Sequence, residues 1–190
     1  MNADKISAIP TGVTLATLDN GLTISVREDH TDPVISVQAW CSVGSIHEGK
    51  WLGAGMSHIL EHMLLKGTKT RTGERISQEV QEVGCNITAY TFYDYSVFNV
   101  DGLSKGSKVA IDVLCDIMRN ASFPEEALAK ELDVIRREMD MGADDPFRRS
   151  SRRMLEVAFT KSPYRYKPIG YVDLFNQVQR QDIQNYYAEK

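Results

Sequence analysis

Alternation of apolar and polar residues in the first part of the chain predicts β-strands. Residues 34–40 alternate with a period of two, as expected for a half-buried strand. An Asp-Asn-Gly turn signal at residues 19–21 predicts a hairpin over residues 13–28. Two more strands are predicted near residues 85–92 and 95–101. The strands therefore fall mostly before the helices in the sequence.

Helical patterns dominate the remainder. Ser122-Phe123-Pro124-Glu125 has the form of a capping box, so the helix that it opens is expected to end at Gly142. The last third should close with turns over 162–170 and a short helix. Strands first and helices second, with antiparallel hairpins, predict an α+β domain. The expected helices cover residues 54–66, 72–84, 105–120, 123–142 and 146–159.

Composition describes an ordinary globular protein of one medium domain. The chain has 190 residues, 42% apolar and 25% charged, with a net charge of −4, so neither nucleic acid nor an anionic membrane surface is an expected partner. No membrane span and no signal peptide are expected, and the compartment is not indicated. Three cysteines predict buried free thiols rather than a disulfide framework. Four arginines within 148–153 are interpreted as a solvated or domain-contacting helix face.

The helix expected over 54–66 carries the chemistry. His58, Glu61 and His62 fall within roughly 100° of arc, because positions i, i+3 and i+4 are neighbours on a helix. Apolar residues occupy the other directions, so this helix should be buried. Buried ionisable groups are costly unless they are satisfied, and one divalent metal would satisfy all three. Two core histidines with ordinary hydrogen bonds are the alternative.

The helix expected over 123–142 offers a third ligand. Leu128, Ile135 and Met139 define its core stripe, and Glu131 and Glu138 lie near that stripe, two turns apart. Two acids on an apolar face need a cation. Arg or Lys from elsewhere in the fold could supply it, but a metal is favoured because the first helix provides only two imidazoles.

These motifs together resemble the pitrilysin-type zinc peptidases (family M16, inverzincins), which include mitochondrial processing peptidase and insulin-degrading enzyme. In that family the third ligand is a Glu about 76 residues after the second His, and Glu138 stands there in this chain. The resemblance extends from about residue 12 to the end. The matching blocks are Gly44-Ser45 with Glu48, then Gly55-x-x-His58-x-x-Glu61-His62-Met63, then Lys66-Gly67-Thr68.

The resemblance implies a fold and a set of roles. The fold would be a mostly antiparallel sheet packed on one side by helices. His58, His62 and Glu138 would bind Zn²⁺, and Glu61 and Glu131 would be the catalytic residues. Glu61 would be the general base for a zinc-activated water, and Glu131 would support the site from close by. The activity implied is hydrolysis of peptide bonds in extended or unfolded peptides.

Substrate binding is expected on an edge strand. The family's Asn-Ala-x-Thr segment pairs with an extended peptide by strand addition, and the corresponding residues here are Thr88, Ala89, Tyr90 and Thr91. Thr88 replaces the family Asn, so main-chain pairing should survive while any hydrogen bond from the Asn side chain is in question.

The resemblance also implies that residues 1–190 form one catalytic domain of a longer two-domain subunit, truncated before its last strand. A second M16 domain or subunit, in a homodimer or heterodimer, is the expected partner, and the isolated piece is expected to be weakly active or inactive. Two alternatives remain. One is a non-catalytic, peptide-binding partner subunit. The other is an S-ribosylhomocysteine lyase-like enzyme with Cys115 as third ligand.

Overall fold

The computed structural model describes residues 12–190. The first ten residues, for which no signal peptide is expected, lie outside this part. The described chain divides into two compact units, and the boundary between them lies after Pro33.

The first unit is the predicted hairpin. Strands β1 (Val13–Thr17) and β2 (Thr23–Arg27) pair antiparallel, with Val13 opposite Arg27. Gly21 has a φ of +87°, a left-handed value that suits glycine in the turn between them.

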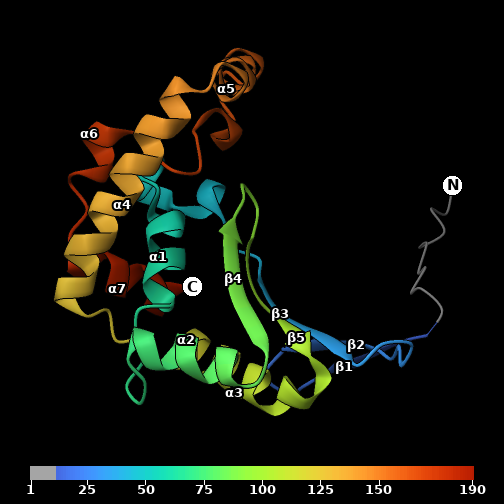
Figure 1. Ribbon diagram of the computed structural model, residues 1–190. Helices are drawn as coiled ribbons and strands as arrows, with labels where there is room; N and C mark the ends of the chain where they lie inside the picture. Colours follow the sequence, from blue (N-terminus) through green and yellow to red (C-terminus); the bar gives the residue numbers. More distant parts are fainter. Residues whose placement is uncertain (1–11) are drawn as a thin grey trace, which may run out of the picture. The chain divides into compact units, whose positions relative to one another are not determined.

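The second unit is built on a three-stranded antiparallel sheet (Figure 1). Strand β5 (Ser96–Leu103) is central, with β3 (Val34–Cys41) on one side and β4 (Cys85–Thr91) on the other. Val100 faces its partners Val37 and Ile87 across the two ladders. Among residues 34–190, β4 pairs only with β5, so it is an edge strand of this sheet.

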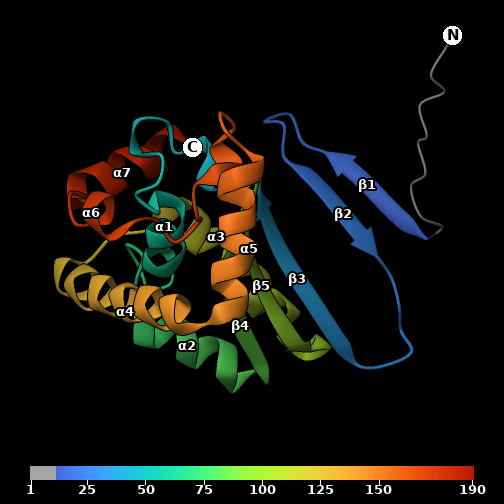
Figure 2. The ribbon, with the colours of Figure 1, turned by 90° about the horizontal axis from the view of Figure 1, so that it is seen from above.

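Helices cover one face of this sheet (Figure 2). On that face Phe98 and Val100 of β5 are fully buried, whereas Trp40 of β3 points to the opposite face and is 59% exposed. The predicted α+β architecture is therefore confirmed. The helices are α1 (Met56–Leu64), α2 (Gly73–Glu82), α3 (Ser107–Asn120), α4 (Glu125–Asp144), α5 (Pro146–Ala158), α6 (Val172–Phe175) and α7 (Arg180–Glu189). Four 3₁₀ turns accompany them: η1 (Ser45–His47), η2 (Gly49–Trp51), η3 (Ser104–Gly106) and η4 (Pro163–Arg165).

Helix α1 lies between two apolar clusters. Its Ile59 and Met63 pack with residues of α4 and α7, and Leu64 packs with residues of α2, α3 and the sheet. Leu60 contacts both clusters. The prediction that this helix is buried on nearly all sides is confirmed, and burial on both sides fixes its position.

Four predictions about helix ends and the number of closing helices are wrong. Helix α1 begins at Met56, because Gly55 has a φ of +75° and caps it. The capping box at Ser122 does not form: Phe123 has a φ of +50° and Pro124 is the N-cap of α4, so Ser122 bonds to Gly67 and Arg180 instead. Helix α4 continues past Gly142 to Asp144, and the chain closes with two helices, α6 and α7, rather than one.

The cysteine prediction is also partly wrong. Cys41, Cys85 and Cys115 are free, but only Cys85 is buried, and Cys115 is exposed on α3. The apolar neighbours of Cys115 in sequence point to other sides of its helix. None of the helices described within residues 12–190 is long and apolar enough to cross a membrane.

Two isoleucines on α3 test the packing of the sheet-side cluster. Ile117 is fully buried and Ile111 is 51% exposed. Ile117→Ala should lower the free energy of unfolding by about 3 kcal/mol, because it deletes buried carbons and leaves a cavity, whereas Ile111→Ala should change it by less than about 0.5 kcal/mol. Urea denaturation of both variants measures this, and equal losses would contradict the described packing.

Candidate metal centre

Close backbone packing fixes the start of α1. A Cβ on Gly55 would lie 2.3 Å from the carbonyl oxygen of Ile169, so only glycine allows this approach. The backbone N–H of Tyr171 donates to the carbonyl of Gly53 at 2.8 Å. The turn over residues 167–171 therefore buttresses the helix at the turn that carries His58.

A buried carboxyl group also holds the start of α1. Glu48 Oε1 accepts a hydrogen bond from the backbone N–H of Ser57 at 2.9 Å, so it satisfies one of the donors that a helix N-terminus leaves unpaired. Burial raises the pKa of Glu48 to about 7, and hydrogen bonds from Ser57, Met56 and Gly55 only partly offset that rise. Ser57 Oγ is hydrogen-bonded to Tyr186 OH at 2.9 Å, which links α1 to α7.

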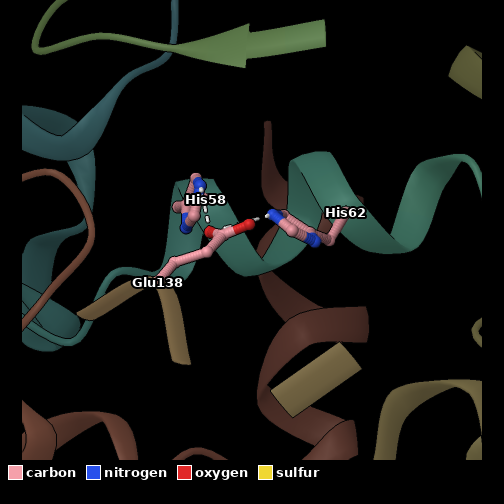
Figure 3. A group of neighbouring side chains, drawn as sticks. All are labelled: His58, His62 and Glu138. Atoms are coloured by element: carbon pink, nitrogen blue, oxygen red, sulfur yellow. Dashed lines mark ion pairs between the residues drawn. The ribbon is translucent and has the colours of Figure 1, made fainter. Parts of the chain in front are cut away.

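Helix α4 brings a carboxylate to the two imidazoles of α1 (Figure 3). Glu138 Oε2 lies 3.7 Å from His58 Nε2 and 3.7 Å from His62 Nε2. One donor atom from each residue lies within 4.8 Å of the others. The three residues that the sequence predicts as metal ligands therefore lie together in the structure.

The spacing and chemistry of this cluster suit a divalent metal. Zinc binds imidazole nitrogen and carboxylate oxygen at about 2.1 Å, which places tetrahedral ligands about 3.4 Å from one another. The two 3.7 Å separations are close to that value. Three protein ligands leave one position open, as in hydrolytic zinc sites.

The protonation state of His58 suits metal binding. Burial, with a smaller effect from His62, lowers the pKa of His58 to about 4. The imidazole is therefore neutral near pH 7, as a metal ligand must be. Its Nδ1 is buried and has no hydrogen-bond partner among residues 12–190.

Glu131 orients the second imidazole. His62 Nδ1 lies 2.9 Å from Glu131 Oε2, and Lys66 Nζ lies 2.8 Å from Glu131 Oε1. Burial opposes ionisation of Glu131, but the hydrogen bonds from Lys66 and His62 outweigh it and lower its pKa. An ionised Glu131 accepts the Nδ1 proton and leaves His62 Nε2 free to face Glu138. The cation that the sequence required for this acid is thus Lys66.

Glu61 lies beside the cluster but does not join it. Its side chain is 8% exposed in a buried helix, and its Oε2 has no hydrogen-bond partner in the described chain. Burial raises the pKa of Glu61, while a hydrogen bond from Thr91 acts against the rise. Glu61 lines a mainly apolar cavity of about 320 Å³, with Leu60 and Phe98 among the other walls.

The expected substrate strand separates into two faces. The side chains of Thr88 and Tyr90 on β4 are exposed on the outer face, and Thr88 Oγ1 donates to Asn99 Oδ1 at 2.9 Å. Ala89 and Thr91 are half-buried on the helix-facing side, and Thr91 Oγ1 donates to the carbonyl of Ser57. Contacts of α1 thus involve Ala89 and Thr91 rather than the other two side chains.

The structural roles of Glu48 and Tyr186 are not evident from the sequence pattern. Glu48 belongs to the family-like block that begins at Gly44-Ser45, and no periodicity indicates that it reaches the N-terminus of a helix nine residues ahead. A Glu in a glycine-rich loop just before a buried helix is the signal that could have found it.

Comparison with known proteins decides the family. Residues 23–170 match the family described as Insulinase (Peptidase family M16). The chain belongs to this family. The resemblance found in the sequence is therefore confirmed.

Several curated relatives are similar over much of the chain. The probable mitochondrial-processing peptidase subunit beta of Arabidopsis thaliana is 32% identical over 181 residues, which cover 95% of this chain and 34% of that protein. An uncharacterized zinc protease of Rickettsia felis is 33% identical over 82% of this chain and 36% of its own length. Cytochrome b-c1 complex subunit 1 of Rattus norvegicus is 35% identical over 66% of this chain and 26% of its own length. The chain thus spans about a third of the length of these relatives.

Solved structures share the fold. A protease from Helicobacter pylori superposes with a TM-score of 0.86 at 24% identity, over 93% of this chain and 42% of that one. The peptidase M16 inactive domain from Pseudomonas fluorescens gives 0.84 at 16% identity, over 93% and 43%. At these identities the likeness establishes the fold alone.

Glu48→Gln tests the buried carboxyl group at the start of α1. Because the pKa of Glu48 is higher in the folded chain than the ordinary 4.5, its contribution to stability is present below about pH 4.5 and is lost as pH rises through about 7. The Gln variant cannot ionise, so relative to the parent its free energy of unfolding should gain about 2 kcal/mol between pH 5 and pH 8.

Urea denaturation of metal-free protein at several pH values measures this difference. Glu82→Gln, at an exposed position on α2, is the matched control and should show no such trend. A pH-independent difference for Glu48→Gln would show that the carboxyl group does not ionise in this range.

Proposed function

We propose that this chain is the zinc-binding catalytic domain of a metalloendopeptidase. The observation that carries the proposal is the convergence of His58 Nε2 and His62 Nε2 on one carboxylate oxygen of Glu138. Partly buried ionisable groups are costly without a partner, and a metal ion held by all three would satisfy them. Two relatives named as zinc proteases support zinc as that metal.

Glu61 is the proposed general base. A bound zinc supplies Lewis-acid chemistry, lowering the pKa of a water and polarising a peptide carbonyl. Glu61 lies one helical turn from His58, and its raised pKa suits a group that accepts a proton from water and passes it to the leaving amine. Its low exposure also limits the bulk water that reaches it.

Glu131 is proposed to act through His62 rather than on substrate. Glu131 holds the imidazole of His62 in one tautomer and orientation, and Lys66 keeps the Glu131 carboxylate ionised. Glu131 is therefore a positioning residue, which narrows the catalytic role expected from the sequence.

The edge of β4 that is unpaired within residues 34–190 is the proposed binding site for an extended peptide. Strand addition would use the backbone of Thr88, Ala89 and Tyr90, so the replacement of Asn by Thr88 matters little for main-chain pairing. Because α1 contacts the helix-facing side of β4, a peptide on this edge would run beside the metal centre.

A second M16 domain or subunit is the proposed partner. Relatives are named as a subunit of mitochondrial-processing peptidase and a subunit of the cytochrome b-c1 complex, and the matched part covers 34% of the first and 26% of the second. A non-catalytic, peptide-binding role is the second candidate, because one structural neighbour is titled an inactive domain. Cys115, the ligand required by a lyase-like site, is exposed on α3 and does not join the His58, His62 and Glu138 group.

Two substitutions separate metal binding from chemistry. Glu138→Ala removes a ligand and should lower zinc affinity at least about 100-fold, whereas Glu61→Gln should retain one zinc per chain and lose hydrolysis of an unfolded peptide. Mass spectrometry under native conditions gives the stoichiometry, and fluorogenic peptide cleavage by the chain together with its partner domain gives the rate.

Exposed acids on the same protein provide the controls for this pair. Glu126→Ala on α4 and Glu82→Gln on α2 should leave both zinc content and rate unchanged. Near-normal cleavage by Glu61→Gln would refute its role as base. A zinc-to-protein ratio near zero in the parent chain would favour the non-catalytic candidate.

Glu131→Gln tests the positioning role. It keeps the size of the side chain but weakens the hydrogen bond that orients His62, so zinc affinity should fall about 10- to 100-fold. Competition with a chromophoric chelator measures the affinity, and the d–d spectrum of the Co²⁺-substituted protein reports ligand geometry. Unchanged affinity and spectrum would show that Glu131 serves only to pair Lys66.

A further inference from the structure

Helix α5 packs loosely and carries much positive charge. None of its 13 residues is fully buried, and Phe147 at its start is 78% exposed. Its N-terminus is well formed, because Asp145 accepts hydrogen bonds from the backbone of Phe147 and Arg148. The helix is thus a stable element that exposes its basic face.

A pocket of about 580 Å³ lies between α5 and the turn that follows η4. Its volume is within the range of sites that bind small ligands or single side chains of a partner, about 300 to 1,000 Å³. Four cations and one acid line it. They are Arg149, Arg152 and Arg153 with Glu156 on α5, and Lys167 on the turn.

The single acidic residue of the pocket, Glu156, already has partners within the chain. Glu156 Oε1 accepts from Tyr171 OH at 3.3 Å, and Glu156 Oε2 lies 3.3 Å from Arg153 Nη1. Arg152 Nε is a looser neighbour at 3.9 Å. Within residues 12–190, neither Arg149 nor Lys167 has a carboxylate oxygen within 4.0 Å. The residues that line the pocket therefore carry an excess of positive charge.

Lys167 shows the consequence of that excess. Its Nζ lies 4.8 Å from the centre of the Tyr171 ring, which holds the ammonium group at the wall of the pocket. Burial, together with the nearby Arg152, lowers the pKa of Lys167. An anion in the pocket would favour the charged form of Lys167 and so act against both effects.

The pocket also has a defined place relative to the metal centre. Its turn packs against the start of α1, where Gly55 meets Ile169. Tyr164, just before that turn, donates a hydrogen bond to Asp94 in the β4–β5 connection. Figure 1 shows α5 and this segment beyond the end of β4 where Thr91 lies, while α2 and α3 lie at the other end. A peptide extended along β4 would leave the strand toward the pocket.

We propose that this pocket binds an acidic side chain of the bound peptide, so that the chain selects peptides with Asp or Glu on one side of the cleaved bond. The inference rests on the proposed function, because it takes the β4 edge as the peptide site. Arginine forks match a carboxylate with two parallel hydrogen bonds, and Lys167 adds a point charge. The exposed apolar residues of α5 are available to contact the rest of the peptide segment.

The test compares short extended peptides that differ only in charge and position. One carries two Glu residues at its N-terminal end, one carries them at its C-terminal end, and a third has Gln at both places. Fluorescence anisotropy with the zinc-free 190-residue chain at low salt measures binding. One Glu peptide should bind about tenfold more tightly than the Gln peptide, and this preference should weaken as salt screens the charges.

Variants on the same helix locate the effect. Arg149→Gln combined with Lys167→Gln should abolish the preference for Glu. Arg148→Gln is the matched control, since Arg148 is on α5, is exposed and does not line the pocket. Equal binding of Glu and Gln peptides, no binding of any peptide, or an equal loss in the control would each overturn the proposal.

Cleavage by the zinc-loaded chain with its partner domain keeps the two proposals distinguishable. If Glu and Gln peptides are cleaved with equal kcat/KM and bind equally, the pocket proposal fails and the peptidase function stands. If the Glu peptide binds through Arg149 and Lys167 but is not cleaved, the pocket stands and the peptidase function fails. Tight binding of inorganic phosphate without any Glu preference would assign the pocket to a free oxyanion and overturn the peptide assignment.

Discussion

Burial of ionisable groups on α1 is the constraint from which the rest of this structure follows. His58, Glu61 and His62 share one face of a helix whose other faces pack into two apolar clusters. Isolated charges in such a place would be unstable, so the fold must supply partners. Helix α4 provides partners for the two imidazoles with Glu131 and Glu138, which lie two turns apart on one face. The packing of α4 on α1 is thus both a core contact and the assembly of the site.

The surroundings hold α1 where these partners can meet. Glu48 satisfies a donor at its first turn, and Gly55 allows the 167–171 turn to press against it. On the other side, β4 contacts α1 through its half-buried residues and leaves its own edge unpaired within residues 34–190. A rigid helix flanked by an open strand edge is a suitable arrangement for chemistry on an extended chain, because each reacting group is held before the peptide arrives. The basic pocket beyond that edge extends the same surface.

Much of this arrangement could be predicted from sequence, for reasons that particular residues make clear. Period-two alternation predicts β3, and the helical spacing of His58, Glu61 and His62 places them on one face without any structure. The positions of Glu131 and Glu138 beside the apolar stripe of the second helix indicate that this helix contributes carboxylates to the site. Local pattern was enough here because the signal lies within single helices.

Other features depend on contacts between distant segments and were missed or misjudged. Ser122 looked like an N-cap, but Phe123 turns the chain and Ser122 bonds to Gly67 and Arg180 instead. Lys66 as the partner of Glu131, Tyr186 as the partner of Ser57 and Lys167 in the basic pocket are all set by tertiary packing. No periodicity in one segment specifies which residue of another segment will face it.

The proposed function depends on one zinc ion held by His58, His62 and Glu138. X-ray absorption spectroscopy of the zinc-loaded chain tests it most directly, since zinc–nitrogen and zinc–oxygen distances of about 2.0 to 2.1 Å and imidazole scattering are read from the metal itself. Two imidazole ligands per zinc are expected in the parent chain and one in His62→Ala. A spectrum with a sulfur ligand, or one unchanged by His62→Ala, would contradict it.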